Sequence, residues 1–237
     1  MNTPTLTILV PVFNEQRTLH TIMHALTSSH PDAQIIYIDD GSSDGSLELL
    51  RKDSRPQDIV LTKKNGGKGS AIRLGLTHAT GDYTVIQDAD LEYDPKEIAM
   101  LLAEAKAHPG CAVFGSRFLR DNPNIYKRFL LGNKVLTFCM NILFGTHLTD
   151  SYTCYKLLPT ENFRSLHLHA NGFELEAEIC ARAVRSGIPI REVAISYHPR
   201  TIAEGKKINW KDAWRGLKMM MQIRFRPTHA PLSRVTS

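Results

Sequence analysis

The chain has 237 residues, of which 42% are hydrophobic and 22% charged, and a formal net charge of +5 at neutral pH. A chain of this length and apolar content buries a sizeable core, and we predict a single domain over residues 1–237. The longest nearly apolar run, Val135 to Phe144, is well short of the ~20 residues that span a bilayer, which argues against a transmembrane helix. The four cysteines stand singly without C-x-x-C spacing, and no charged-then-apolar leader begins the chain. These features favour buried thiols in a cytoplasmic protein over disulfides, a zinc site or secretion.

Basic residues gather at the C-terminal end of the sequence. From Arg200 to Ser237, nine Lys or Arg stand against two acidic residues, a net charge of +7, which leaves −2 for residues 1–199. A basic tail on a mildly acidic body indicates an anionic partner, such as phosphates or an acidic membrane face. We do not expect a nucleic-acid partner, because the tail has no recognised binding motif and the body has no basic helix with interleaved aromatics.

Extended and helical patterns alternate through the first half of the chain. Strands are predicted at 6–12, 34–38, 58–61, 83–86 and 112–115, and helical patterns at 19–26, 46–52, 71–76 and 95–107. The junctions carry Gly, Asp or Asn, which turns prefer. This alternation is typical of βαβ units, so we predict an α/β fold with a Rossmann-like, mostly parallel sheet flanked by helices.

The pattern changes after residue 117. A basic amphipathic segment at 126–144 is followed by a helix at 173–185, a strand at 191–197 and a basic helix at 210–226. No internal repeat or low-complexity linker separates these parts. We therefore treat them as an extension of the same domain that ends in a basic C-terminal helix.

The predicted C-terminal helix is amphipathic. At ~100° per residue, its apolar stripe consists of Trp210, Trp214, Leu217 and Met221, with Ala213 and Met220 beside it. Its basic stripe consists of Lys211, Arg215 and Lys218. The pattern suits a helix at a membrane interface, and it equally suits a helix that docks on the body of the protein. The segment at 126–144 is the other candidate membrane surface.

Two carboxylates follow the fourth predicted strand. The strand at 83–86 runs into Asp88 and Asp90, which point the same way if the chain is still extended there. Two anionic oxygen donors so close together suit a hard cation such as Mg²⁺ or Mn²⁺ and repel each other without one. Asp94, followed by Pro95, is instead predicted to cap the next helix.

Acidic and turn-forming residues also stand at the other strand ends. They are Pro11, Asn14 and Glu15 after the first strand, Asp39 and Asp40 after the second, and Asp88 and Asp90 after the fourth. The lysine-glycine loop at 63–70 lacks P-loop spacing, and no G-x-G-x-x-G follows the first strand. Open α/β sheets bind ligands at the carboxyl ends of their strands, so these residues predict a nucleotide crevice with a metal held on a diphosphate.

Seven short motifs occur in order along residues 6–215. They are Val10-Pro11-Val12-Phe13-Asn14-Glu15, Ile38-Asp39-Asp40-Gly41-Ser42-Ser43-Asp44-Gly45, Asn65-Gly66-Gly67-Lys68-Gly69, Asp88-Ala89-Asp90, Gly115-Ser116-Arg117, Gly172-Phe173-Glu174-Leu175-Glu176, and Arg200-Thr201 with Glu204-Gly205-Lys206-Lys207. In this order they resemble a family 2 glycosyltransferase with the GT-A fold. Within that family the chain is similar to dolichol-phosphate and polyprenol-phosphate mannosyl- or glucosyltransferases.

The resemblance implies a role for each matching residue. Contacts with the donor nucleotide sugar are implied for Pro11, Asn14, Glu15, Asp39, Asp40, Lys68, Asp88 and Lys206, with one of Asp39 or Asp40 on the nucleoside. A divalent metal, Mg²⁺ or Mn²⁺, is implied at Asp88 and Asp90, and contacts with an acceptor phosphate at Ser116, Arg117 and Arg128. Arg200 and Lys206 would close over the donor diphosphate, and the implied catalytic residues are Asp90, Arg117 and Arg200. Residues 1–120 would then bind the nucleotide sugar, and residues 121–237 would form the acceptor side and the basic tail.

Glu92 differs from the sequence pattern of the family that the chain resembles, since many dolichol-phosphate mannosyltransferases have Gln there. It is either a third metal ligand or an exposed residue that leads into a helix. The transmembrane helices that follow the domain in some relatives are also absent, so we expect any membrane contact to be peripheral, at the inner face, or to need a separate membrane-protein partner.

The expected activity is an inverting, metal-dependent transfer of a hexose from a nucleoside diphosphate sugar to a polyprenyl (dolichyl or undecaprenyl) phosphate. The donor would be of the GDP-mannose or UDP-glucose class. One alternative is transfer to a sugar hydroxyl in surface polysaccharide assembly, which would require a carboxylate base from Asp150, Glu174 or Glu176. Another is a non-catalytic GT-A-like binding module, which has no reason to keep two repelling acids at a strand end.

Overall fold

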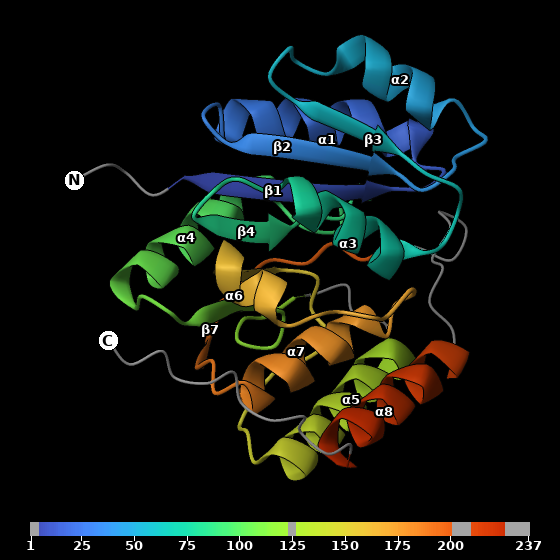
Figure 1. Ribbon diagram of the computed structural model, residues 1–237. Helices are drawn as coiled ribbons and strands as arrows, with labels where there is room; N and C mark the ends of the chain where they lie inside the picture. Colours follow the sequence, from blue (N-terminus) through green and yellow to red (C-terminus); the bar gives the residue numbers. More distant parts are fainter. Residues whose placement is uncertain (1–4, 123–126, 201–209, 226–237) are drawn as a thin grey trace.

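Seven strands form one sheet in this computed structural model, which describes residues 5–122, 127–200 and 210–225 (Figure 1). The strands are β1 (Leu6–Val12), β2 (Gln34–Asp39), β3 (Ile59–Thr62), β4 (Tyr83–Ile86), β5 (Ala112–Ser116), β6 (Lys156–Pro159) and β7 (Ile190–Ala194). Their order across the sheet is β3-β2-β1-β4-β6-β5-β7, and among them β6 alone runs antiparallel to its neighbours. This mostly parallel sheet confirms the predicted α/β architecture.

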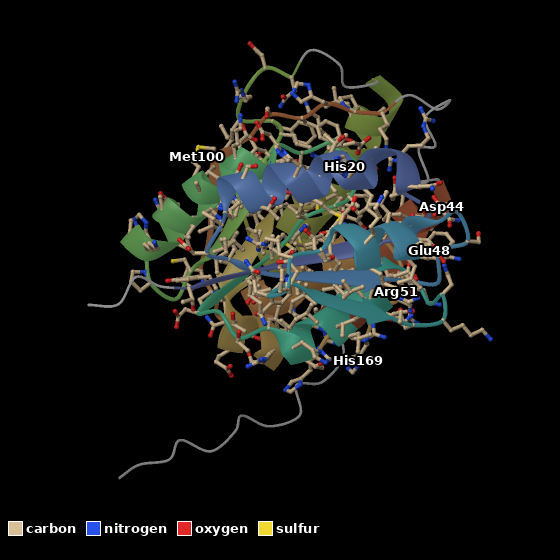
Figure 2. All side chains as sticks on the ribbon, turned by 90° about the horizontal axis from the view of Figure 1, so that it is seen from above. His20, Asp44, Glu48, Arg51, Met100 and His169 are labelled. Carbon is tan, nitrogen blue, oxygen red and sulfur yellow. The ribbon has the colours of Figure 1, made fainter. Side chains whose placement is uncertain are left out.

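Helices cover both faces of the sheet. They are α1 (Gln16–Ser29), α2 (Ser46–Asp53), α3 (Lys68–His78), the 3-10 turn η1 (Pro95–Glu97), α4 (Ile98–Ala107), α5 (Lys127–Phe144), α6 (Thr160–Ser165), α7 (Leu175–Arg185) and α8 (Trp210–Phe225). α1 and α4 lie on one face of the sheet, and α3 and α6 lie on the other (Figures 1 and 2). In α1, Leu19, Ile22, Met23 and Leu26 are the buried positions, at helical spacing. Burying one such large side chain fully contributes roughly 1.5–3 kcal/mol, so this core holds the layers together.

β1 and β4 form the centre of the sheet. Both are almost wholly buried, with Leu9 of β1 paired with Ile86 of β4, and Val12 paired with Asp39 of β2. Apolar runs without alternation are what parallel strands need when helices cover both faces. The register brings the carboxyl ends of β1, β2 and β4 to the same edge.

Three local features differ from the sequence-based expectation. The sequence predicts no strand at β6, which inserts between β4 and β5 and carries the buried Lys156 in an otherwise apolar run. β7 ends at Ala194 and does not continue to Tyr197. Asp94 does act as a cap, since its Oδ1 accepts the Lys96 N–H at 3.0 Å, but the element that it caps is η1, and α4 begins afterwards.

The C-terminal helices form a further layer, in which α7 lies between the sheet and the pair of α5 and α8 (Figure 1). α8 docks on the body through Gly216, Met220 and Ile223, all buried, and membrane contact by this helix stays a prediction. Trp214 and Met221 do not take part in this docking, since they are 64% and 43% exposed. The side chains of residues 210 and 211 lie outside the described part of the structure.

No helix within the described ranges is long and apolar enough to cross a membrane. Cys154 and Cys180 are buried and Cys111 and Cys139 are partly buried, all four as free thiols. The predicted absence of disulfides among these cysteines therefore agrees with the structure.

Candidate active site

The segments that leave β1, β2 and β4 start from adjacent positions. The Asp40 N–H donates to the Val12 carbonyl oxygen at 2.8 Å, and the Gln87 N–H donates to the Leu9 carbonyl oxygen at 2.9 Å, so the ladders continue just beyond the strands. β2 and β4 lie on opposite sides of β1, and the strand order reverses at this point. Open α/β sheets bind ligands at such a switch point.

The turn after β1 is built by Asn14. Its φ of +53° lies in the left-handed region, which Asn tolerates better than most residues. Its Oδ1 accepts the Ser43 N–H at 2.8 Å, and the N–H of the next residue, Glu15, donates to Ser46 Oγ at 3.0 Å. The loops after β1 and β2 therefore hold each other in place. Pro11, also predicted to face the nucleoside, lies on β1 and is partly exposed.

Asp39 and Asp40 are both buried, and both accept backbone N–H groups. Asp39 closes its own turn through two hydrogen bonds, to the N–H groups of residues 41 and 42, at 3.1 Å and 3.3 Å. Asp40 binds the loop at 63–67 more tightly, accepting Lys63 Nζ at 2.6 Å and two glycine N–H groups at 3.0 Å and 2.7 Å. Asp40 thus shapes this loop, and Asp39 is the more available of the two for a nucleoside.

Asp88 forms an ion pair with Lys68, the first residue of α3, at 2.7 Å between Oδ1 and Nζ. The same Nζ lies 2.9 Å from Glu176 Oε1, and the other oxygen of Glu176 lies 2.6 Å from the buried Lys156 Nζ. Burial by itself would lower the pKa of Lys68, but Asp88 and its other anionic neighbours outweigh it and raise that pKa well above the ordinary value. Lys68 therefore stays charged. A side chain at Gly69 would overlap a backbone carbonyl of the segment before α7, so glycine permits this close approach.

Asp90 forms an ion pair with Arg200. Nη2 of Arg200 lies 2.9 Å from Asp90 Oδ2, and Nη1 lies 2.9 Å from Glu15 Oε2, so one guanidinium joins the ends of β1 and β4. Burial, followed by the negative charges of Asp88 and Glu92, raises the pKa of Asp90 to about 7 against the opposing effect of Arg200. The site thus has more negative charge than its own cations neutralise, and a bound cation would favour the ionised carboxylate.

Asp88 and Asp90 would point the same way only on an extended chain, and the chain is not extended there. The strand ends at Ile86, and the chain turns through Leu91, whose φ is +63°. The two acids still influence each other, since Asp88 is the charge that raises the Asp90 pKa most. The turn, and not strand alternation, brings them together.

Glu92 positions the segment that carries Arg200. Its Oε1 accepts the Arg200 N–H at 2.7 Å, and its Oε2 accepts the Tyr197 hydroxyl at 2.8 Å. The Tyr197 ring packs edge-on to Tyr93 and lies 5.0 Å from the guanidinium of Arg117. Glu92 is therefore not an exposed helix lead, and its role as a metal ligand stays a prediction.

Arg117, at the end of β5, makes a buried two-point ion pair with Asp150. Its Nε and Nη2 lie 2.7 Å and 2.9 Å from the two carboxylate oxygens. Burial alone would lower the pKa of Arg117, but Asp150 outweighs it and raises that pKa well above the ordinary value. Asp150 is held in turn by Glu192, which accepts its N–H at 2.9 Å. The neighbouring Ser116 is also buried, and its hydroxyl lies 2.6 Å from that of Thr149.

The predicted acceptor contacts of Ser116 and Arg117 stay predictions, because both side chains are engaged within the protein. Nη1 of Arg117 is the guanidinium nitrogen for which the described part of the chain shows no hydrogen bond. Lys206 lies outside the described residues, as does the side chain of Arg128.

The predicted metal site depends on which acidic side chains could bind Mg²⁺ or Mn²⁺. No group of three or more His, Cys, Asp or Glu within the described residues is arranged to hold a metal by itself. Mg²⁺ usually takes one or two carboxylates and completes its shell with substrate phosphates and water. Asp90, with its raised pKa, and Asp88 fit that limited requirement, provided that Lys68 and Arg200 release an oxygen.

Sequence reasoning missed three residues that build the site. Lys63 holds Asp40, Lys156 holds Glu176, and Tyr197 holds Glu92. The sequence does indicate the role of Lys156, because a charged residue within a short apolar run is typical of a buried charge that needs a partner. The other two partners are 23 and 105 residues away from the acids that they bind, so no local pattern identifies them.

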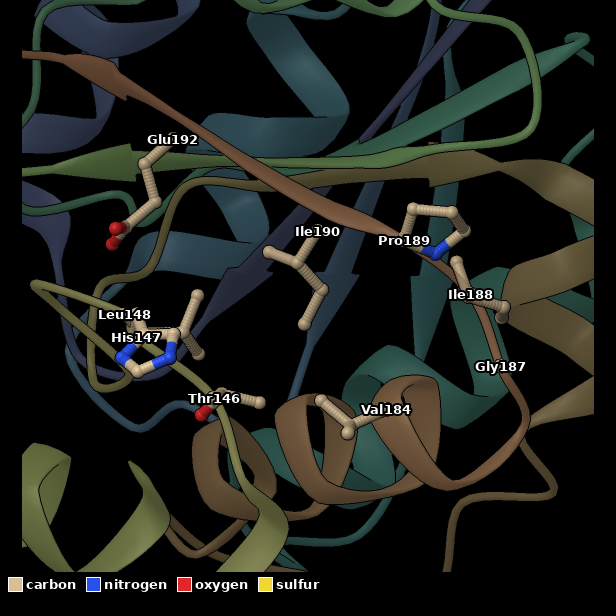
Figure 3. Close-up of a pocket in the computed structure, with 9 residues that line it drawn as sticks. All are labelled: Thr146, His147, Leu148, Val184, Gly187, Ile188, Pro189, Ile190 and Glu192. Atoms are coloured by element: carbon tan, nitrogen blue, oxygen red, sulfur yellow. The ribbon is translucent and has the colours of Figure 1, made fainter. Parts of the chain in front are cut away.

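A separate pocket of about 420 Å³ lies between the loop at 146–148 and the segment from 184 to 192 (Figure 3). Its walls are about equally polar and apolar and come from the loop at 146–148, the end of α7 and the start of β7. Glu192 lies at its border, and the carboxylate is already bonded to the N–H groups of Thr149 and Asp150. The pocket therefore lies beside the support of Arg117 and apart from the acids at the strand ends.

The comparison with protein families gives the class of the chain. The profile described as glycosyl transferase family 2 matches residues 7–166. The chain belongs to glycosyl transferase family 2.

Curated relatives share parts of this chain. A low-salt glycan biosynthesis hexosyltransferase of Haloferax volcanii is 25% identical over 92% of this chain and 53% of its own length. An undecaprenyl-phosphate 4-deoxy-4-formamido-L-arabinose transferase of Salmonella paratyphi B is 38% identical over 46% of this chain and 35% of its own length. The chain thus spans about half, or less, of the length of these relatives.

Solved structures share the fold. Glucosyl-3-phosphoglycerate synthase from Mycobacterium tuberculosis in complex with UDP superposes with a TM-score of 0.75 and 17% identity, covering 95% of this chain and 82% of that chain. The same enzyme in complex with Mn²⁺, UDP and phosphoglyceric acid gives a TM-score of 0.74 with 16% identity, covering 95% of this chain and 80% of that chain. These likenesses confirm the GT-A architecture.

Proposed function

We propose that this glycosyltransferase moves a hexose, with inversion, from a nucleoside diphosphate sugar to a polyprenyl phosphate. The observation that carries the donor part is the arrangement of Asp88 and Asp90, with Lys68 and Arg200 beside them, at the switch point of the sheet. Two acids with two cations can hold both a metal and a diphosphate. The donor would be of the GDP-mannose or UDP-glucose class, and the solved neighbour in complex with UDP supports such a donor.

A bound Mg²⁺ or Mn²⁺ would neutralise charge on the diphosphate as it departs, and Asp88 and Asp90 are the residues that would hold it. The remaining contacts with the donor would come from side chains of the protein. The guanidinium of Arg200, which binds Glu15 and Asp90, would turn from the acids to the diphosphate oxygens, while Glu92 holds the Arg200 backbone N–H in place. Asp39 would contact the nucleoside. Asp40 and Asn14 keep the two flanking loops in place.

The engagement of the candidate bases supports a phosphate acceptor. Both oxygens of Asp150 are bonded to Arg117, and both oxygens of Glu176 are bonded to lysines. Neither carboxylate is poised to remove a proton. A phosphate monoester is largely ionised at neutral pH and needs no base, whereas a sugar hydroxyl does. The Salmonella relative, which is named for transfer to undecaprenyl phosphate, supports the same acceptor class.

The hydroxyl-acceptor alternative rests on Glu174. Its Oε1 accepts two N–H groups before α7, but its buried Oε2 has no hydrogen-bond partner among the residues that the structure describes. That oxygen is the one candidate base, among the three carboxylates considered, that the described structure leaves available.

Transfer assays decide between these acceptors. Radiolabelled GDP-mannose or UDP-glucose is supplied with Mn²⁺ and one of three acceptors, which are undecaprenyl phosphate, dolichyl phosphate and an oligosaccharide with free hydroxyl groups. We expect label in a polyprenyl phosphate only, and little loss of rate for Glu174→Gln. Transfer to the sugar hydroxyl that is abolished by Glu174→Gln would replace the phosphate acceptor with the alternative.

Donor binding can be measured separately by thermal shift. A ligand present at a hundredfold its dissociation constant stabilises the folded state by about 2.7 kcal/mol, so the correct donor raises the melting temperature by several degrees. We expect that rise to depend on Mn²⁺. A donor with full affinity in the presence of a chelator would contradict the metal part of the proposal.

A further inference from the structure

Four large apolar side chains follow one line along α5. Leu131, Val135, Phe138 and Ile142 are between 51% and 66% exposed. At ~100° per residue they lie within about 60° of one another, and the buried Met140 lies on the opposite side of the helix. A helix that only docks on a protein places polar residues farthest from its buried face. α5 places large apolar residues there.

α8 repeats this arrangement. Trp214, Met221 and Phe225 are 64%, 43% and 68% exposed and fall within about 40° of one another. Met220 and Ile223, which are buried, lie on the other side. The predicted apolar stripe of this helix thus separates into a docked side and an outward side.

The two outward lines lie on one surface of the molecule. α5 and α8 pack against each other, and both pack against α7, which separates them from the sheet (Figure 1). Together they carry seven of the ten large apolar side chains that are exposed within the described residues. We call this surface the apolar platform. A contiguous exposed apolar surface of this kind is typical of a site that binds a protein partner or a membrane.

The charge around the apolar platform selects the kind of partner. α5 and α8 carry seven Lys or Arg and one acidic residue, Asp212, which is buried. Lys134, Lys218 and Arg224 are exposed on the same two helices. A surface that is apolar at its centre and basic at its margins complements anionic lipid, which is apolar below its phosphates.

We propose that the apolar platform docks on an anionic bilayer, with its aromatic and aliphatic side chains among the headgroups and its basic side chains against lipid phosphates. The inference rests on the proposed function in one respect, because the polyprenyl acceptor would be reached from that same bilayer. α5 is also joined to the site. Thr137 of α5 lies 3.1 Å from the Ser151 hydroxyl, and Ser151 follows Asp150, the partner of Arg117.

Co-sedimentation with vesicles tests the apolar platform. The wild-type protein should bind vesicles of phosphatidylcholine with phosphatidylglycerol, and binding should weaken with salt and disappear on phosphatidylcholine alone. The variant with Lys134→Gln, Lys218→Gln and Arg224→Gln should lose about a hundredfold in partitioning, from about fivefold per charge. The control variant Arg51→Gln, Lys52→Gln and Lys106→Gln removes the same charge from exposed positions elsewhere and should bind within about twofold of wild type.

The apolar contribution has its own pair of variants. Phe138→Ser with Phe225→Ser should reduce vesicle partitioning about tenfold or more, because each removes a large buried apolar area from the lipid-bound state. Met100→Ser, on the outer side of α4 where Met100 is 41% exposed, is the matched control and should bind like wild type (Figure 2). Circular dichroism checks that all variants fold.

Three results would overturn the inference. They are no vesicle binding by the folded protein at low salt, equal losses in the control variants, and a wild-type dimer that Phe138→Ser with Phe225→Ser turns into a monomer. Such a dimer would make the apolar platform a contact between copies. Saturable binding to a membrane protein in detergent, without vesicle binding, would make it a protein-docking surface.

Transfer to a short-chain, water-soluble polyprenyl phosphate separates the docking proposal from the proposed acceptor. Transfer without vesicle binding removes the docking alone, and vesicle binding without transfer to any polyprenyl phosphate removes the proposed acceptor alone.

Discussion

Arg200 Nη2 lies 2.9 Å from Asp90 Oδ2, so the second of the two acids after β4 is paired with a residue 110 positions later in the chain. The same guanidinium reaches Glu15 at the end of β1. The acids of the site are therefore paired with cations of the protein itself. Binding of a metal and a diphosphate would exchange these partners, with the metal on the acids and the guanidinium on the phosphates.

Removing the Asp90 charge should abolish turnover without unfolding the protein. Asp90→Asn keeps the shape of the side chain but leaves the metal and Arg200 without their shared partner. We expect kcat to fall by about a hundredfold or more, the usual scale for the loss of a charged group that acts on the transition state. Steady-state assays across a range of Mn²⁺ concentrations measure this. Asp32→Asn, an exposed acid at a distance, serves as the control, and near wild-type turnover of Asp90→Asn at limiting Mn²⁺ would refute the metal assignment.

Asp39 and Asp40 should behave differently although they are adjacent. Asp40→Ala leaves Lys63 Nζ and two glycine N–H groups without an acceptor, so we expect a loss of about 2–4 kcal/mol in unfolding free energy. Asp39→Ala loses two longer hydrogen bonds and should cost about 1–2 kcal/mol, while weakening donor binding more. Urea unfolding and donor titration of the two variants measure both effects. Equal donor affinities in the two variants would show that neither acid is selective for the nucleoside.

The ion pair of Arg117 and Asp150 should be structural as well as functional. Arg117→Met leaves the Asp150 carboxylate buried without its cation, and we expect a loss of about 3–5 kcal/mol. Replacing both residues, by Arg117→Met with Asp150→Leu, should recover much of this stability but no activity. Arg120→Met breaks a half-exposed pair with Glu97 at 3.4 Å and should cost less than about 1 kcal/mol. If Arg117→Met is as stable as Arg120→Met, the pair does not hold this part of the fold.

Two glycines in neighbouring helices should respond in opposite directions to alanine. A Cβ at Gly216 in α8 would overlap the Tyr152 hydroxyl, whereas nothing lies within 4 Å of a Cβ at Gly132 in α5. We expect Gly216→Ala to lower the melting temperature, since overpacking costs about 1–3 kcal/mol, and Gly132→Ala to raise it by helix propensity worth up to about 1 kcal/mol. Differential scanning calorimetry of the two variants measures the contrast. A stabilised Gly216→Ala protein would show that α8 does not dock on Tyr152.

Local patterns identified most of the fold and the ends of its central strands. The apolar runs of β1 and β4 and the turn residues after them, from Asn14 to Glu15 and from Asp88 to Glu92, lie within a few residues of one another, so the sequence shows them directly. β6 was not predictable in this way. Its residues are four in number and begin with Lys156, and its place in the sheet depends on partners in β4 and β5.

The partners of the site residues could not be read from the sequence either. Asp150 was a candidate base by its residue type, but it holds Arg117, 33 residues earlier. Glu176 was another candidate, and two lysines at separations of 108 and 20 residues occupy it. Pairings at such distances follow from topology, and a pattern of residue types gives no indication of them.

The position of β6 has a consequence for synthesis of the chain on the ribosome. β4 stays without its outer neighbour until β6 emerges roughly 70 residues later, which at ~5–20 residues per second takes several seconds. During that time a central apolar strand presents an open edge, and β5 has no partner at all because β6 and β7 both follow it. A nascent chain that stops before residue 156 would expose this edge and be prone to aggregation. The first 120 residues are therefore expected to be insoluble when expressed alone, although they contain most of the acids that are predicted to contact the nucleotide.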